Sequence, residues 1–95
     1  MNQFAIYHKE DAQRAFCKHY KLTEEQARNT PLQPVNVRQL GAMQAWIITD
    51  SHGNKWLQSY NTIVSVKWAD TGEFERLGKW SVSTSRQQTR FEREV

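Results

Sequence analysis

Residues 58–91, which read QSYNTIVSVKWADTGEFERLGKWSVSTSRQQTRF, decide the fold of this 95-residue chain. Apolar and polar residues alternate through 62–68, which is typical of a strand with one buried face. Asp70-Thr71-Gly72 then has the composition of a hairpin loop that ends on a left-handed glycine. This stretch therefore predicts an antiparallel hairpin, followed by a Ser/Thr-rich segment that leads into a basic C-terminal helix.

The alternation also predicts which side chains of this hairpin are buried. In the first strand, Val64, Val66 and Trp68 are expected to face the core, opposite Ile63, Ser65 and Lys67. The second strand is expected over 73–83, with Trp80 and Val82 inward and a bend at Gly78.

More strands precede this hairpin. Residues 45–49 (AWIIT) are apolar on both faces, as in an interior strand that includes Trp46. A turn over 50–54 leads into a return strand over 55–60. Upstream, residues 30–41 are expected to form an extended connector that lays Leu32, Val35 and Val37 over the sheet, and Phe4–Tyr7 forms a short opening strand.

Two helices are predicted to pack on this sheet. Asp11–Tyr20 has an apolar stripe at helical spacing, and Thr23 with Gln26 forms a capping box for a short helix that ends near Arg28. Thr84 or Ser85 is expected to cap the C-terminal helix, with Phe91 and Val95 facing in. The prediction is a single α+β domain over 1–95. Its parts are a helical region and connector over 1–41, an antiparallel sheet of about four strands over 42–83, and a helix over 84–95.

Composition narrows the class of protein. The net charge of +3 and the pI of about 9.2 favour an anionic partner and argue against a nucleic-acid mimic. The single cysteine, Cys17, cannot form an intramolecular disulfide. Because the sequence shows neither a signal peptide nor an apolar run of bilayer length, a cytoplasmic protein without membrane contact is expected.

The sequence predicts no catalytic residue, no metal and no cofactor. Cys17 and His19 are two positions apart on a helix and do not face each other, while His8 and His52 are isolated. The adjacent residues of 50–52 (DSH) cannot form a catalytic triad. The chain also lacks a nucleophile elbow and a glycine-rich phosphate loop, so an enzyme is not expected.

The candidate binding residues are mainly basic. Two stripes at i, i+4 and i+7 lie on the two main helices: Arg14, Lys18 and Lys21, and Arg86, Arg90 and Arg93. If both stripes point the same way, they form a patch that can follow a phosphate backbone. If they point apart, each is a solvated helix face.

Further candidates lie near turns. The Ser83–Arg86 junction, with Ser85 at its centre, is either a helix cap or an anion site at a helix N-terminus. Trp56, beside the 50–54 turn, is the tryptophan most readily placed at the surface. Tyr60 and Asn61 lie where two predicted strands join and are a second candidate for a functional surface edge.

Residues 57–64 (LQSYNTIV) and 80–91 (WSVSTSRQQTRF) carry a resemblance that spans about 56–91. They resemble small proteins of phages and other mobile elements, in which a Ser-Tyr-x-Thr-x-Val strand precedes a Trp-Ser-x-Thr-Thr-Ser-Arg/Lys segment. Ser83 stands where a Thr is expected. The resemblance implies a phage origin, the cytoplasm of a bacterial host, and a protein that binds a host machine; it implies no chemistry.

Two functional hypotheses follow. The first is a non-enzymatic phage-type accessory protein that inhibits or modulates a host or defence protein complex, in the manner of an anti-CRISPR protein. The second is a nucleic-acid-binding module that uses the basic helix faces. An open sheet edge would also allow a homodimer.

Overall fold

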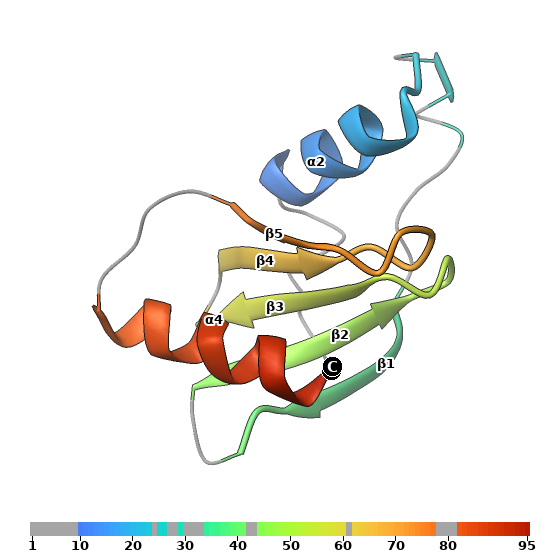
Figure 1. Ribbon diagram of the computed structural model, residues 1–95. Helices are drawn as coiled ribbons and strands as arrows, with labels where there is room; N and C mark the ends of the chain where they lie inside the picture. The colour runs from blue at the N-terminus through green and yellow to red at the C-terminus, as the bar shows by residue number, and fades with distance from the viewer. Residues whose placement is uncertain are drawn as a thin grey trace.

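The computed structural model describes residues 10–23, 25–26, 29, 34–41, 44–60, 62–77 and 82–95 (Figure 1). The elements in chain order are α2 (Glu10–Tyr20), β1 (Pro34–Gln39), β2 (Ala45–Asp50), β3 (Lys55–Ser59), β4 (Thr62–Lys67), β5 (Phe74–Arg76) and α4 (Val82–Glu94). The five strands form one antiparallel sheet in the order β1-β2-β3-β4-β5. This architecture confirms the predicted α+β class.

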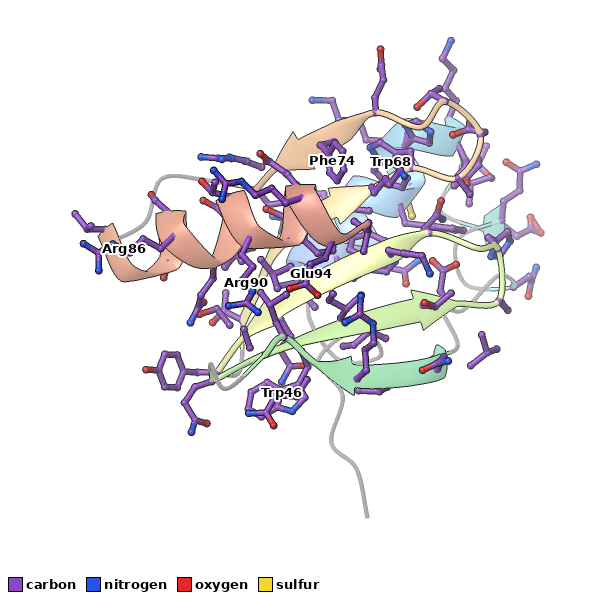
Figure 2. The ribbon with its side chains drawn as sticks, turned by 60° about the horizontal axis from the view of Figure 1, so that its bottom comes forward. Trp46, Trp68, Phe74, Arg86, Arg90 and Glu94 are labelled. Atoms are coloured by element: carbon purple, nitrogen blue, oxygen red, sulfur yellow. The ribbon has the colours of Figure 1, made fainter. Side chains whose placement is uncertain are left out.

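The two helices cover opposite faces of the sheet. Neighbouring residues of one strand point to opposite faces, and Ile48 packs with Phe16 of α2 whereas Ile47 packs with Phe91 of α4. Figure 2 shows α4 in front of the sheet and α2 behind it. Each face therefore has its own hydrophobic core.

A β-bulge decides which face the residues of β4 reach. Leu57 pairs with Ser65 and Gln58 pairs with Ile63, so Val64 is the extra residue. The expectation that Val64 and Val66 share a face is wrong. Ile63, Val66 and Trp68 lie in the α2-side core, whereas Val64 lies in the α4-side core. Alternation with a strict period of two does not predict a bulge, and one inserted residue moves the side chains that follow it to the opposite face.

The sheet is wider at its start than predicted. The segment expected to be a connector contains β1, which pairs with β2 through Val37 and Ile48. Val37 packs against the α2-side core as expected, but Val35 lies at a register irregularity and is 65% exposed. Periodicity missed β1 because an edge strand with mostly exposed side chains has no apolar alternation.

The last strand differs from the prediction in the described part of the chain. Of the strand expected over 73–83, Phe74–Arg76 forms β5, whose three side chains are exposed, and residues 78–81 lie outside the described residues. Val82 does not face the core: it begins α4 and is 70% exposed. The predictions for Phe4–Tyr7, Gly78 and Trp80 lie outside the described residues.

Two tryptophans of the sheet region differ in burial. Trp68 is buried, whereas Trp46 is only partly buried. The capping box is confirmed, since Thr23 N donates to Gln26 Oε1 at 2.9 Å and Gln26 N donates to Thr23 Oγ1 at 3.1 Å.

Neither of the long helices described here, α2 and α4, has the length and apolar character needed to cross a bilayer.

Candidate functional site

The outer face of α4 carries an open hollow. Inward, Phe91 is fully buried and Gln88 donates from Nε2 to Val64 O at 2.8 Å. Outward, one open hollow of about 580 Å³ runs along the helix, and its lining consists of Val82, Ser85, Arg86, Thr89, Arg90, Arg93 and Glu94. The lining residues recur at helical spacing, so a single helix face presents them together.

Ion pairs fix this helix to strands on both sides. Toward β1, Glu94 accepts from Arg38 Nη1 at 3.1 Å and from Arg90 Nε at 2.8 Å. Hydrogen bonds from Arg90, and next from Arg38, hold the pKa of Glu94 below its ordinary value. Toward β5, Arg76 makes a two-point contact with Glu92, at 2.9 and 3.1 Å, and this hydrogen bonding raises the pKa of Arg76.

The predicted arginine stripe of α4 divides into two kinds of residue. Arg90 and Glu94 point toward each other (Figure 2), so the charge of Arg90 is compensated within the molecule. Arg86 and Arg93 are exposed and make no hydrogen bond or ion pair with the described part of the chain. They lie seven positions apart, about 10 Å along the helix axis. Two such guanidinium groups can bind carboxylates or phosphates in a bidentate manner.

Ser85 is not the helix cap that the sequence predicted. Because α4 begins at Val82, Ser85 lies within the helix, and its carbonyl oxygen accepts a hydrogen bond from Thr89 Oγ1 at 3.0 Å. The same reasoning removes Thr84 as a cap. An anion site at a helix N-terminus is therefore not centred on Ser85, although its side chain does line the hollow.

The second basic stripe lies on the other side of the molecule. Arg14 and Lys18 are exposed on α2. Lys21 follows the helix end with φ +56°, and Leu22 N donates to Cys17 O at 2.9 Å, which is the hydrogen bond of a Schellman-type terminus. Since α2 and α4 cover opposite faces, the two stripes point apart and do not form one patch.

Trp56 is not at the surface, contrary to the prediction. It is fully buried, and its Nε1 donates to Asp50 Oδ2 at 2.8 Å. The same carboxylate also accepts from the amides of His52 and Asn54 and from Asn54 Nδ2. A buried indole needs an acceptor, and the aspartate that closes β2 provides one. This turn is therefore a structural element.

Tyr60 remains an exposed aromatic candidate. Ser59 pairs with Thr62, so the turn between them holds Tyr60 and Asn61, of which Asn61 lies outside the described residues. The Tyr60 side chain is 62% exposed, and its backbone has φ +55°. Left-handed backbone is unfavourable for a bulky residue by about 1–2 kcal/mol. Such outliers are found preferentially at functional sites.

The β1–β2 turn connects Tyr60 with the α4 face. Tyr60 N donates to Gln44 O at 3.0 Å on this turn. At its other end, Gly41 has φ +59°, and a Cβ there would come within 2.9 Å of Arg90 Nη2. Glycine thus allows Arg90 to pack closely on the turn. Tyr60 and the basic helix flank the same turn.

Sequence reasoning missed three lining residues, namely Val82, Thr89 and Glu94. The sequence does contain a pattern that places Val82 and Thr89 on this face. Val82, Arg86, Thr89 and Arg93 follow one another at intervals of three or four residues, which is the spacing of one helix face. The prediction of a strand over 73–83 assigned Val82 to the sheet, so the helical spacing that begins at Val82 was not used. In the described ranges, no three His, Cys, Asp or Glu side chains lie close enough to hold a metal ion.

The fold and the site define a small α+β domain that presents a partly uncompensated basic helix on one face of its sheet. The chain belongs to the family described as a family of unknown function, DUF8033, which it matches over residues 32–94. This match includes the whole sheet and α4 but not α2. No curated protein and no solved structure matches the chain.

Proposed function

We propose that this protein is a non-enzymatic binding module that docks the outer face of α4 on an acidic surface of a partner protein. The supporting observation is the pair Arg86 and Arg93, which are exposed, lack partners in the described chain and line one hollow. Ion pairs to β1 and β5 hold the helix in place. A preorganised helix loses little entropy when it binds.

The composition of the hollow favours a protein over a nucleic acid. Val82 adds an exposed apolar side chain beside the arginines, as in the mixed surface of a protein interface. The resemblance to small phage proteins supports a host or defence protein complex as the partner, with inhibition or modulation as the outcome.

The test uses charge reversal on one face with a matched control on the other. Arg86→Glu with Arg93→Glu changes the charge of the α4 face, and Lys18→Glu with Lys21→Glu makes the same change beside α2. All four side chains are exposed and make no ion pair in the described chain, so both variants are expected to fold. Circular dichroism checks this.

Quantitative affinity capture from a bacterial lysate compares the wild type with both variants. We expect a partner that is retained by the wild type and by the α2-side control but is lost from the α4 variant. Equal retention by all three proteins would contradict the proposal. Binding of the purified partner in moderate salt then measures the affinity directly.

The alternative function is nucleic-acid binding through the α4 arginines alone. It predicts binding to random-sequence DNA or RNA that weakens steeply with added salt. Fluorescence anisotropy with a labelled oligonucleotide measures this property. Tight, salt-sensitive binding that is lost with Arg86→Glu and Arg93→Glu would replace the protein partner with a nucleic acid.

A further inference from the structure

A second hollow lies at the opposite end of β3 from Tyr60. Its volume is about 310 Å³, and its lining consists of Gly53, Lys55, Lys67, Trp68, Ala69 and Gly72. These residues come from the β2–β3 and β4–β5 turns and from the adjoining strand ends. Ala69 N donates to Asn54 Oδ1 at 2.8 Å, which ties the two turns together. The walls of the hollow are therefore held by hydrogen bonding.

Two lysines lie directly opposite each other beside this hollow. Lys55 of β3 is the register partner of Lys67 of β4, and both are partly buried. Like charges directly opposite on neighbouring strands repel. No described side-chain carboxylate lies within ion-pair distance of either amine. The hollow is thus flanked by two cations without an acidic side chain between them.

The two amines turn away from each other toward oxygen acceptors. Lys55 Nζ donates to Thr49 Oγ1 at 3.0 Å, on the β2 side. Lys67 Nζ donates to the backbone oxygen of Val95 and lies 5.6 Å from the ring centroid of Phe74, on the β5 side. The two amines therefore bind separate acceptors, on opposite sides of the β3–β4 pair.

Two carboxylates of the β4–β5 hairpin, those of Asp70 and Glu75, are engaged elsewhere. Asp70 contacts His19 Nε2 at 2.8 Å, on the side of α2. Glu75 accepts a hydrogen bond from Trp68 Nε1 at 3.1 Å. Both contacts engage these acidic oxygens with partners other than the lysine amines.

The glycines shape the hollow in different ways. A Cβ on Gly72, where φ is +76°, would meet no atom within 4 Å, so the mouth is open at this turn. A Cβ on Gly53 would lie 3.4 Å from Ala69 Cβ, which is close packing at the wall.

We infer that this hollow binds a phosphate group, held between Lys55 and Lys67. A doubly charged anion between two ammonium groups converts their repulsion into two attractions. The flexible lysine stems allow both amines to turn inward. A charge-assisted bond to phosphate is roughly twice as strong as a bond to a neutral oxygen. The site is separate from the α4 face, so it stands independently of the proposed function.

The test is a titration with inorganic phosphate at constant ionic strength, followed by the amide resonances in two-dimensional NMR. We expect saturable shifts confined to the two turns and to the ends of β3 and β4. Lys55→Gln and Lys67→Gln should each weaken phosphate affinity about tenfold. Lys18→Gln, on α2, removes a charge outside the site and should leave the affinity unchanged.

Two further measurements complete the test. One distinguishes free phosphate from a phosphorylated side chain as the ligand, and the other distinguishes this site from the α4 arginines. Binding of O-phosphoserine as tightly as inorganic phosphate would identify a phosphorylated side chain as a ligand, and weaker binding would favour free phosphate; both support the site. The Arg86→Glu, Arg93→Glu variant should keep the response. Shifts that do not saturate, that spread over all basic residues, or that persist in both glutamine variants would overturn the inference.

Discussion

The two faces of the sheet are built from different side chains. On the α2 side, aromatic rings pack against one another: Trp56 and Trp68 have centroids 5.5 Å apart, and Phe16 and Tyr20 have centroids 4.8 Å apart. His19 stacks in parallel on Trp68 at 3.8 Å and also contacts Asp70. These rings bury large areas and position the polar groups among them.

The α4 side is more polar beneath its helix. Among the described side chains of α4, Phe91 alone is apolar and fully buried. Gln87 and Gln88 are buried beside it, and the Gln87 Oε1 and Ser65 Oγ atoms have no hydrogen-bond partner in the described part of the chain. Phe91 is therefore the main apolar anchor of α4, and the Gln88 hydrogen bond and the exposed ion pairs at its rim add smaller contributions.

The contrast explains why the two faces offer different functions. Asp50, Asp70, His19 and Tyr20 on the α2 side all have partners inside the fold, so their chemistry supports stability. On the α4 side, the ion pairs leave Arg86 and Arg93 without partners in the described chain. Exposed cations without ion pairs in the described chain lie on both sides, Lys18 and Lys21 on the α2 side and Arg86 and Arg93 on α4, but only those of α4 lie on the helix with fewer buried apolar contacts.

The largest expected effects come from removing the aromatic anchor of each helix. Phe16→Ala and Phe91→Ala should each lower the free energy of unfolding by about 3–5 kcal/mol, because both side chains are fully buried. Phe91→Ala should also release α4 before the sheet unfolds, since that helix has no other fully buried apolar side chain among those described. Urea titrations followed by circular dichroism and by tryptophan fluorescence measure the two events. Coincident transitions in Phe91→Ala would show that α4 is held more firmly than we conclude.

Buried polar contacts should rank next, with a larger effect on the α2 side. Asp50→Ala deprives Trp56 Nε1 and the 50–54 turn of their acceptor, at a cost of about 3 kcal/mol in the free energy of unfolding. Gln88→Ala removes one hydrogen bond to Val64 O and should cost about 1 kcal/mol. Urea denaturation of both variants gives the comparison. A larger loss for Gln88→Ala would reverse the ranking of the two faces.

Tyr60 belongs to neither core, and its substitution should stabilise the protein. Asn tolerates the left-handed backbone that Tyr60 adopts at φ +55°, so Tyr60→Asn is expected to gain about 1 kcal/mol. Thermal unfolding measures the gain. Tyr60→Phe, which retains the unfavourable conformation, is the control and should leave the stability nearly unchanged. A loss of stability in Tyr60→Asn would mean that the ring makes contacts which offset the strain.

The smallest expected effect is the acid dependence of the ion pairs that hold each helix. The hydrogen bond from His19 holds the pKa of Asp70 below its ordinary value, and those from Arg90 and Arg38 do the same for Glu94. A depressed carboxylate pKa contributes stability that is fully present above the ordinary value and is lost as the pH falls through the folded-state value. Both carboxylates are exposed, so solvent screening keeps the effect small.

Neutral variants identify the carboxylate responsible. Asp70→Asn and Glu94→Gln should each flatten the decline of the melting temperature below about pH 4. Scanning calorimetry over an acid series measures the slope. If neither variant changes it, other carboxylates cause the acid dependence.

Much of the fold followed from local patterns. The helix over Glu10–Tyr20 has its apolar stripe at helical spacing, and the capping box of Thr23 and Gln26 forms as its residue types require. Strands β2, β3 and β4 lie where the sequence predicts them, because β2 and β3 are bounded by a clear turn and β4 alternates. These features depend on neighbours within a few residues, so the sequence shows them directly.

By itself, then, the sequence determined the α+β class, the central strands and the inward position of Phe91. Only the tertiary structure decided the rest. Partner strands define β1 and place the bulge at Val64, and the acceptor on Asp50 accommodates Trp56 in the core. The packing of α2 and α4 on opposite faces separates the two basic stripes. Each of these outcomes depends on contacts between segments or across a turn, which hydrophobic periodicity does not encode.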